Sequence, residues 1–511
     1  MFDLLPGFVL TSLSFLATLL VFAIGCVILG IAILYVIDRT QTKNTVRRNY
    51  PVIGRLRYVF QHLGEFFRQY FFAMDREELP FNRAQRTWAE RASKDEDNTV
   101  AFGSTRDLRP VGTPMFVACP FPTLERDAEK TPAVTVGPYC RQPYVHEPIF
   151  NISGMSYGAL SRVAVKSLSR GAAHAGCWYN TGEGAMSEFH LEGGCDIIFQ
   201  IGTAKYGCRK PDGSFSEETL ANVAAHEQVK MFEIKLSQGA KPGKGGILPG
   251  DKVTVEIAKT RGIPVGQDSI SPNRHVEIDN PGELLDFIDR VRNVTGKPTG
   301  FKTVISGVVW LGQLFEEIHK RGIESAPDFI TVDSADGGTG AAPQSLIDNM
   351  GLPIWESLPM VADQLIRYDL RDRVKLISSG KLITPTDVAW ALCAGADFVV
   401  SARGFMFALG CIQALKCNKN TCPTGITTHN KDLQRGLVPR EKQYRVAHYA
   451  KNMEKEIGTI AHSCGVREPR RLKRYHVRIQ TDTGKSIPMD QLWPYPETGE
   501  ALRKAEATAA E

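Results

Sequence analysis

The sequence predicts an α/β protein whose main part is a (β/α)8 TIM barrel, preceded by one transmembrane helix. Two observations lead to this prediction. From Pro148 to Ala408, short apolar runs that end in Gly, Ser or Asp alternate with helix-like stretches, which is typical of a parallel sheet with crossover helices. From Phe8 to Ile37 no residue is charged, and such a stretch is long enough to cross a bilayer.

The composition is that of an ordinary globular protein. Of the 511 residues, 43% are hydrophobic and 23% are charged, and the formal net charge is only +5. The chain has no long basic run and no interleaving of aromatic and basic residues, so we expect no nucleic-acid partner. The eleven cysteines are an odd number and no cleaved secretory signal is evident, which favours a reducing compartment over a disulfide framework.

Nine apolar runs lie in the predicted barrel, one more than a (β/α)8 barrel needs. We expect eight of them to close the barrel and DIIFQIG to be an insertion. Glycines and polar residues gather at the carboxyl ends of the runs, where barrel enzymes build their sites. The runs are FNISGMS, WYNTGEG, DIIFQIG, FEIKLSQG, VGQDSISP, GFKTVIS, FITVDSADGG, KLISSG and FVVSARG. The helix-like segments between them include Ser161–Ala175, Gly282–Val294, Leu311–Arg321 and Thr386–Ala394.

The N-terminal apolar run has the length of one membrane span. As a helix, residues 8–37 would be roughly 45 Å long, against a hydrocarbon core of about 30 Å. One tilted span fits this length, and two do not. A signal peptide fits less well, because no Lys or Arg precedes the apolar run and the run is too long. A buried core helix is rarely apolar on all sides over such a length.

The charges around the span predict its orientation. Asp3 precedes it, and six basic residues follow it with Asp38 as the only nearby acid. Because positive charge stays on the cytoplasmic side, we expect a single-pass membrane protein with the rest of the chain in the cytoplasm. The basic residues are Arg39, Lys43, Arg47, Arg48, Arg55 and Arg57.

The parts outside the barrel are less regular. Residues 58–72 mix Phe, Leu and Tyr with Arg and His at roughly helical spacing. They could form a helix on the membrane surface or an amphipathic helix packed on the barrel, and both interpretations stay open. We expect a tail over 1–7, the span over 8–37, a juxtamembrane and connecting segment over 38–147, the barrel over 148–430, and a C-terminal tail over 431–511 that is first helical, then extended, then loose.

Three cysteines stand close together after the last run, in GCIQALKCNKNTCPTG. Cys411, Cys417 and Cys422 have the spacing C-x5-C-x4-C, and thiolates are soft ligands for zinc and for iron–sulfur clusters. A tetrahedral zinc site needs a fourth ligand, for which His429 is the only close candidate. Three thiolates without a fourth instead suit a cluster of three irons. The alternative is three incidental buried cysteines.

A Gly- and Lys-rich loop, IKLSQGAKPGKGGILPG at residues 234–250, follows another predicted strand. It is not a P-loop, because the spacing is wrong and Gly245 stands where Ser or Thr is needed. Its lysines, Lys235, Lys241 and Lys244, would lie at the barrel mouth, where they suit an anionic substrate or a negatively charged reduced flavin. The alternative is a solvated loop.

Glycine-rich segments also end the later strands, as DGGTGAAP at 336–343, SSGKL at 378–382 and SARG at 401–404. Backbone N–H groups after the last two strands of a barrel commonly hold a phosphate, and Arg403 could add a charge-assisted bond. Ordinary turn glycines are the alternative. Of two isolated histidines, we expect His174 to be structural, whereas His275 is a candidate either for lining the site or for a structural role.

Several of these motifs occur together, in the same order, in a known family. SGMSYGALS, NTGEG, IKLSQGAKPGKGGILPG, DGGTGAAP and GCIQALKCNKNTCP resemble the FMN-binding domain of glutamate synthase, over roughly residues 148–430. The whole chain resembles the stand-alone, membrane-anchored branch of that family, the FMN-binding glutamate synthase family proteins. The barrel implied by this resemblance is of the aldolase or FMN-linked type.

The resemblance implies two cofactors and a reaction. An FMN would lie in the barrel beside a [3Fe–4S] cluster, and reduced FMN would pass a hydride to the imine formed from 2-oxoglutarate and ammonia. Lys241 and Arg261 would hold the oxo acid, and Glu183 would lie near the ammonia entry. The implied cluster ligands are Cys411, Cys417 and Cys422; the implied catalytic residues are Lys235, Glu183, Lys241 and Arg261; the implied flavin contacts are Gly154, Met155, Ser156, Gln200, Lys235, Gly337, Gly338, Gly380, Ala402 and Arg403.

The substrate loops depart from the family pattern at three places. The family usually has an acid and a glutamine within KPGEGGQLPG, where this chain has Lys244 and Ile247. SPNRHVE at 271–277 stands in place of SPPPHHD, and FKTVIS in place of VKLVSE. The identity of the oxo acid is therefore the open part of the expectation, while the flavin and cluster motifs are kept.

We therefore expect an oxidoreductase acting on a C–N bond, most directly by reductive amination of a 2-oxo acid, with glutamate as the leading product. The alternatives are a flavin amine or amino-acid dehydrogenase that reduces a membrane carrier, and an inactive membrane-bound scaffold. The sequence shows no dinucleotide-binding fingerprint and no glutaminase domain. The expected partners are thus ferredoxin or a reductase subunit as electron donor, and free ammonium or an amidotransferase as the source of ammonia.

Overall fold

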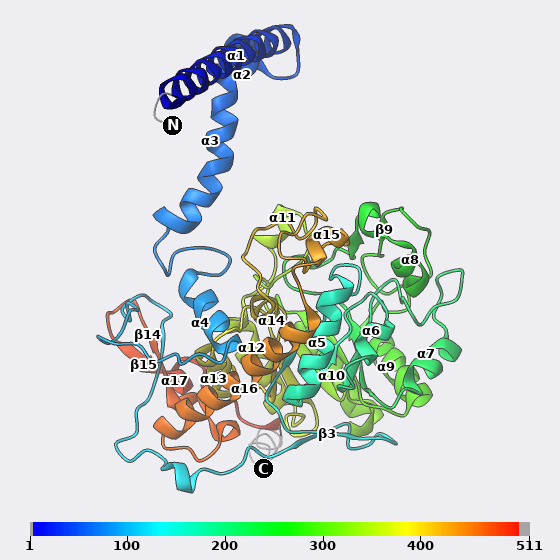
Figure 1. The fold of residues 1–511 in the computed structure, drawn as a ribbon. Coiled ribbons are helices and arrows are strands. Elements are labelled where there is room, and N and C mark those ends of the chain that lie inside the picture. Colours follow the sequence, from blue (N-terminus) through cyan, green and yellow to red (C-terminus); the bar gives the residue numbers. More distant parts are fainter. Residues whose placement is uncertain (1–3, 500–511) are drawn as a thin grey trace, which may run out of the picture. The chain divides into compact units, whose positions relative to one another are not determined.

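The computed structural model describes residues 4–499, which fall into two units divided between Arg83 and Ala84. In the larger unit, eight parallel strands form a closed barrel surrounded by helices (Figure 1). The barrel closes where β13 pairs with β4, with Val400 opposite Asn151 and Ser401 opposite Ile152. The predicted (β/α)8 fold is confirmed. The barrel strands are β4 (Phe150–Ile152), β5 (Tyr179–Asn180), β6 (Ile197–Ile201), β7 (Val229–Lys235), β10 (Thr299–Val304), β11 (Phe329–Asp333), β12 (Lys375–Ser379) and β13 (Phe398–Ser401).

The expected insertion was assigned to the wrong run. DIIFQIG forms β6, which is paired with β5 on one side and β7 on the other and is buried along its whole length. The extra run is VGQDSISP, whose β9 (Ser269–Ile270) pairs antiparallel with β8 (Ile247–Leu248) outside the barrel. The physical reason is burial: the strands of a parallel barrel are covered on both faces, whereas Ile270 is 67% exposed.

The helices around the barrel begin and end at strong sequence signals. In α5 (Arg162–Ala175) the Ser161 side chain accepts a hydrogen bond from the Ala164 N–H, and Gly176 ends the helix in the left-handed conformation. In α9 (Pro281–Thr295) the Asn280 side chain accepts a hydrogen bond from the Glu283 N–H, and Gly296 ends the helix in the left-handed conformation. The four helices predicted from the sequence are present as α5, α9, α10 (Val309–Arg321) and α13 (Pro385–Ala394). The others in this unit include α4 (Arg83–Ser93), α6 (Glu188–Leu191), α7 (Glu217–Ala224), α8 (Val255–Arg261), α11 (Gln344–Ile347), α12 (Ile354–Arg367) and α14 (Arg403–Leu409).

A hairpin from the connecting segment covers the amino-terminal end of the barrel. It consists of β2 (Val134–Val136) and β3 (Tyr144–His146). Val136 and Tyr144 belong to the same buried cluster as Trp178 and the first residues of β11 and β13. The Tyr144 hydroxyl also donates to Asp196, at 2.7 Å. The amino-terminal end is thus filled by packed side chains, which leaves the carboxyl-terminal end for a site.

The segments before and after the barrel join each other. β1 (Pro114–Phe116) pairs with β14 (Val477–Gln480), which also pairs with β15 (Ser486–Pro488). After the barrel come α15 (Lys431–Gln434) and α16 (Pro439–Ser463), and a short α17 (Met489–Leu492) follows the sheet. α16 packs along α5, and a Cβ at Gly171 would lie only 2.4 Å from the Val446 side chain. The expected order of helix and then extended chain in the tail is observed; residues 500–511 lie outside the described part.

The N-terminal unit is helical. α1 (Leu4–Thr40) is followed by α2 (Thr45–Asn49), α3 (Ile53–Phe67) and a π-helical turn over Arg68–Phe72. Residues Gly7–Thr40 are long and apolar enough to cross a membrane, and an 18-residue stretch within them has a mean hydropathy of 3.0. Near the end of α1 the Asp38 carboxylate is buried and accepts from Arg47, Arg55 and the Val52 N–H at 2.7 to 3.1 Å. These bonds fix the turn from α1 into α3. The aromatic side chains of residues 58–72 are exposed.

The side chain of Glu454 joins α16 to the first barrel strand, β4. Glu454 of α16 accepts a hydrogen bond from the Phe150 N–H at 2.7 Å. Burial raises the pKa of Glu454 to about 7, and the backbone hydrogen bonds only partly offset this effect. Because the folded-state pKa lies above the unfolded-state value, this group stabilises the fold below about pH 4.5 and loses that contribution as the pH rises through 7.

We therefore predict that Glu454→Gln, which keeps the hydrogen-bond acceptor, removes one part of the pH dependence of stability. Wild-type protein should lose about 2 kcal/mol more than the variant between pH 5 and pH 8. Thermal unfolding in detergent at several pH values measures the difference. Parallel pH profiles for the two proteins would show that Glu454 keeps an ordinary pKa.

Candidate active site

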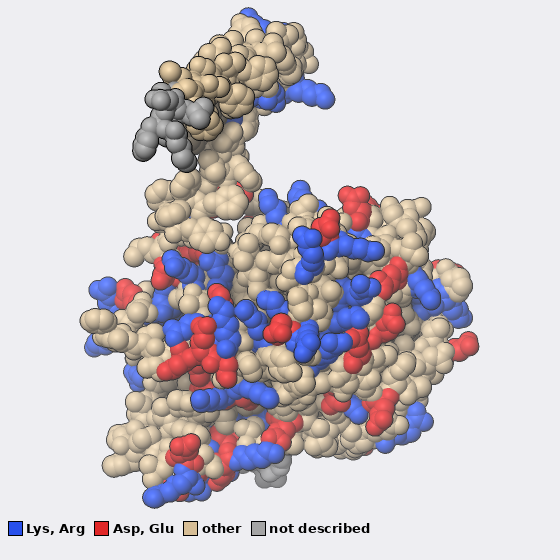
Figure 2. Space-filling model, in the orientation of Figure 1, with Lys and Arg blue, Asp and Glu red and all other residues tan. Residues whose placement is uncertain are grey.

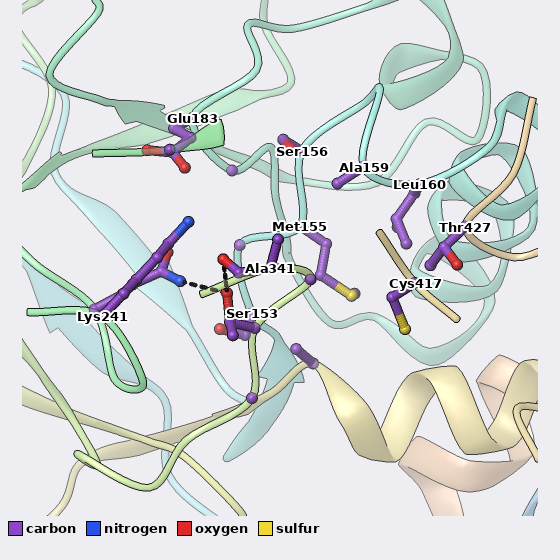
Figure 3. A pocket seen from close by; sticks show the side chains of 18 of the residues that line it. Ser153, Met155, Ser156, Ala159, Leu160, Glu183, Lys241, Ala341, Cys417 and Thr427 are labelled. Carbon is purple, nitrogen blue, oxygen red and sulfur yellow. Dashed lines mark hydrogen bonds between the residues drawn. The ribbon is translucent and has the colours of Figure 1, made fainter. Parts of the chain in front are cut away.

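A cavity of about 1300 Å³, open to solvent, occupies the carboxyl-terminal end of the barrel. All eight strands, or the loops that directly follow them, contribute to its lining. Figure 3 shows Glu183 and Lys241 on one side of the cavity and Cys417 and Thr427 on the other. One lining residue from each strand in turn is Ser153, Glu183, Gln200, Lys235, Lys302, Asp333, Ser379 and Ser401.

A mostly buried ion pair stands at the mouth. The Lys235 ammonium lies 2.9 Å from the Glu183 carboxylate, and it also donates to the Gln238 side chain. Burial alone would raise the pKa of Glu183, but Lys235 and then Lys241 outweigh it and lower this pKa to about 2. Glu183 is therefore an anion at neutral pH, held among cations.

Two further cations lie near this pair. Burial lowers the pKa of Lys241, and the charge of Glu183 partly restores it. Arg261 donates to the Tyr157 carbonyl oxygen at 2.9 Å and lies over the Tyr206 ring, 5.1 Å from its centroid. Lys241 and Arg261 are each only 6% exposed. A small anion that enters this corner would thus meet two cations that water barely reaches.

The cavity floor is a network of polar side chains around Glu233. One carboxylate oxygen of Glu233 accepts from Asn180 at 2.9 Å and from Gln200 at 2.6 Å. The other accepts from the Thr331 hydroxyl at 2.6 Å. Because the Gln200 amide nitrogen is bound to Glu233, the network orients Gln200 beneath the cavity.

The sequence interpretation missed a second ion pair in the lining. Lys302 lies 3.3 Å from Asp333 and 3.3 Å from the Ser379 hydroxyl. Asp333 also accepts from the Gly239 N–H at 2.8 Å. Residue 239 must be glycine, because a Cβ there would lie 1.9 Å from the Ser334 carbonyl oxygen. The available signal was the single lysine inside the apolar run GFKTVIS.

The cysteine loop forms the opposite side. The Cys417 sulfur lines the cavity and lies 3.6 Å from the Arg403 guanidinium. Burial raises the pKa of Cys411, whereas hydrogen bonds from Thr424 and neighbouring groups overcome burial and lower the pKa of Cys422. Cys411 and Cys422 do not line the cavity. Within residues 4–499, no three His, Cys, Asp or Glu side chains converge as ligands of a single metal ion.

The histidines have structural partners. The His429 ring nitrogen Nε2 is hydrogen-bonded to the Gly158 carbonyl oxygen at 2.8 Å, and within residues 4–499 His429 does not converge with the three cysteines as ligands of one metal ion. His275 is buried, contacts the Lys235 carbonyl oxygen at 3.1 Å and is not a lining residue. His174 stacks on Tyr444, as expected for a structural residue.

Most residues singled out in the sequence come together in this one cavity. Gly337 is an exception, since only its neighbour Gly338 lines the wall. The sequence interpretation omitted several lining residues with charged or amide side chains, because the sequence does not show which way these side chains point. The predicted residues that line the cavity are Gly154, Met155, Ser156, Glu183, Gln200, Lys235, Lys241, Arg261, Gly338, Gly380, Ala402, Arg403 and Cys417; those missed include Gln238, Lys252, Lys302, Asp333 and Lys381.

Comparison with known proteins identifies the family of this chain. The family described as the conserved region in glutamate synthase matches residues 117–467. This chain belongs to the glutamate synthase family. It is 38% identical to the glutamate synthase large subunit-like protein YerD of Bacillus subtilis, over 94% of this chain and 98% of that protein.

More distant family members share only part of their length with this chain. It is 32% identical to an archaeal glutamate synthase [NADPH] of Methanocaldococcus jannaschii, over 64% of this chain and 61% of that protein. Among solved structures, a mandelate oxidase is 14% identical with a TM-score of 0.45, over 77% of this chain and 98% of that chain. The barrel topology itself rests on the strand pairing described above.

The Glu183–Lys235 pair predicts a non-additive effect on stability. Lys235→Met should cost about 3 kcal/mol, because it leaves a buried carboxylate without its closest cation. The double variant Glu183→Gln/Lys235→Met should regain at least half of this loss. Thermal or urea unfolding of these two variants and of the single variant Glu183→Gln gives the coupling energy.

A matched control is Lys381→Met, which removes a more exposed ion pair, 2.9 Å from Asp336. It should cost less than about 1 kcal/mol. Strictly additive losses for Glu183 and Lys235 would contradict the pairing.

Proposed function

We propose that this protein is an FMN-dependent oxidoreductase acting on a CH–NH2 group, which reductively aminates a 2-oxo acid through its imine. The observation that carries the proposal is the buried charge cluster of Glu183, Lys235, Lys241 and Arg261 at the mouth of a barrel with a large open cavity. Membership of the glutamate synthase family supports this class of reaction.

The cavity fits a flavin mononucleotide at both of its ends. A Cβ at Gly154 would lie 2.9 Å from the Asn180 amide oxygen and 3.0 Å from the Gln200 amide nitrogen, so glycine keeps the floor open for a flat ring. Gln200 and Lys235 would lie near that ring. The loops after β12 and β13 supply a place for the phosphate, as is common in TIM barrels. The proposed contacts are Gly154, Met155, Ser156, Gln200, Lys235, Gly338, Gly380, Lys381, Ala402 and Arg403.

Reduced FMN, when bound, supplies a hydride. In the forward direction, a 2-oxo acid and ammonia form an imine and water, and the imine then gains one hydride and one proton to become an amino acid. Lys241 and Arg261 would bind the carboxylate of the substrate. Glu183 would orient the nitrogen through its carboxylate, and Lys235 would stabilise negative charge beside the ring in a site screened from water.

We also propose that Cys411, Cys417 and Cys422 hold a [3Fe–4S] cluster, which when bound passes single electrons. In such a cluster each thiolate binds its own iron, so the sulfurs need not converge on one point. The surroundings suit thiolates: Arg403 contacts the Cys417 sulfur, and the buried Lys252 ammonium donates to the Cys417 carbonyl oxygen at 3.2 Å. Ferredoxin or a reductase subunit would donate the electrons, and an amidotransferase or free ammonium would supply the nitrogen.

We propose that α1 anchors the protein in a membrane, with the barrel in the cytoplasm. Figure 2 shows α1 covered by uncharged side chains, whereas the visible face of the barrel unit mixes both signs of charge. The charged residues that follow the span are mainly basic, as expected on the cytoplasmic side. The exposed aromatic side chains of residues 58–72 support a position of this segment at the membrane surface.

The redox core can be tested on detergent-purified protein. Wild type should show flavin absorbance bands plus a broad shoulder, with about three irons per chain. Cys417→Ser should lose the shoulder and most of the iron, because one ligand of the cluster is removed. Cys119→Ser, at a half-buried cysteine outside the motif, should keep both.

The possible results of this test separate the interpretations. Flavin without iron would leave a two-electron flavoenzyme and remove the cluster from the proposal. Folded protein with neither chromophore would favour the inactive scaffold.

The proposed anchoring of α1 in a membrane can be tested by substitutions in the middle of the helix. Leu20→Arg together with Ile24→Arg places two charges in the middle of the span, at about 2.5–3.5 kcal/mol each. This variant should leave the membrane fraction on alkaline carbonate washing, whereas wild type and Leu20→Ala/Ile24→Ala should stay. Release of the wild type under the same wash would contradict a transmembrane anchor.

A further inference from the structure

One corner of the cavity has unused capacity to bind an anion. Lys241 is only 6% exposed and makes no hydrogen bond or ion pair with another side chain or carbonyl group in residues 4–499. The Nε atom of Arg261 is buried and has no hydrogen-bond partner there either. Both cations line the cavity on the side of Glu183, and the charge of each lowers the pKa of that carboxyl. A carboxylate that binds on this side of the cavity would be attracted by both charges.

The other cations in the lining are already engaged within the described chain. Lys235 is paired with Glu183, Lys302 with Asp333 and Lys381 with Asp336. Arg403 donates to the Thr339 carbonyl oxygen and contacts the Cys417 sulfur. Lys252 donates to the carbonyl oxygens of Ala159 and Cys417 at 2.9 and 3.2 Å. Lys244, on the same loop as Lys241, is exposed and does not line the cavity.

The wall beside this corner is apolar. Ile247, Leu248 and Pro249 line the cavity in succession. The wall begins next to Glu183, since a Cβ at Gly246 would lie 2.5 Å from the Glu183 carboxylate. It ends next to Arg261, because Leu248 and Arg261 both approach Gly158, at 3.1 and 3.0 Å from its ideal Cβ. A ligand whose carboxylate binds Lys241 and Arg261 therefore places its side chain against aliphatic groups.

We infer that the substrate is a 2-oxo acid, or the matching α-amino acid, with a single carboxylate and an aliphatic side chain. This inference rests on the proposed function and narrows it to one class of substrate. A dicarboxylate such as 2-oxoglutarate would bring its second carboxylate against the apolar wall, where no free cation of the described lining meets it. A buried and unpaired charge is strongly disfavoured.

Binding to the oxidised, flavin-loaded full-length protein tests the inference without turnover. The flavin difference spectrum is recorded during titration with 4-methyl-2-oxopentanoate and with 2-oxoglutarate. We expect the dissociation constant of the aliphatic acid to be at least about tenfold lower, which is the discrimination that a side-chain pocket of this kind commonly achieves. Anaerobic bleaching of the flavin by L-leucine should likewise be faster than bleaching by L-glutamate.

Variants of Ile247 test whether the apolar wall causes the preference for the aliphatic acid over 2-oxoglutarate. Ile247→Arg adds a cation beside the apolar surface and should reverse the order, so that 2-oxoglutarate binds more tightly than the aliphatic acid. Ile247→Gln adds hydrogen-bond donors without charge and should narrow the difference. The matched control is Ile270→Gln. Ile270 lies opposite Ile247 in the antiparallel pair β8–β9, is 67% exposed and does not line the cavity. It should keep the wild-type preference.

The outcomes separate this inference from the function on which it rests. Tighter binding of 2-oxoglutarate by the wild type would overturn the inference and leave the reductive amination intact. The same would follow if Ile247→Arg left the preference unchanged. No response of a bound flavin to any 2-oxo acid or amino acid would overturn both.

Discussion

The pairing of buried charge is the constraint on which this site depends. Charged side chains stand at the mouth of the barrel in places that water barely reaches, where a charge without a partner is costly, and most of them are paired. Glu183 and Lys235 join the ends of two strands that are not neighbours, β5 and β7. Asp333 joins β11 to Lys302 of β10 and to the loop after β7. The ion pairs that neutralise the cavity thus also hold its loops in place, so that the dipoles around a ligand are set before it arrives.

Local sequence signals predicted the barrel and its surrounding helices well. Apolar runs that end in glycine and polar residues are sufficient to predict the barrel and the end at which its cavity lies, and capped helices such as α5 and α9 could be read almost to the residue. The cavity residues found in advance are those in motifs, including Lys235 and Lys241 of the 234–250 segment, whereas Lys244 of the same segment is exposed and lies outside the cavity lining. Lys302 and Asp333 were missed because their partnership spans neighbouring strands, and a single polar residue in a buried run does not reveal which group it faces.

The errors have a common physical origin. When strands are short, run length and apolarity do not distinguish a barrel strand from a strand of a small antiparallel pair such as β8–β9. From the sequence, β9 was therefore placed in the barrel and β6 outside it. The pairing of β1 with β14 joins residues more than 350 positions apart, and three-residue strands carry almost no periodicity. For His275 a lining role and a structural role were both open, and its ring contacts the Lys235 backbone rather than the cavity. Side-chain direction in a loop depends on tertiary contacts that one sequence does not display.

The hairpin that fills the amino-terminal end of the barrel has a kinetic consequence. Because Tyr144 and Val136 pack into that end, molecules do not cross the described barrel from one end to the other. Substrate and product that pass through the open mouth of the cavity therefore compete for it, and product that accumulates there slows the entry of the next substrate molecule.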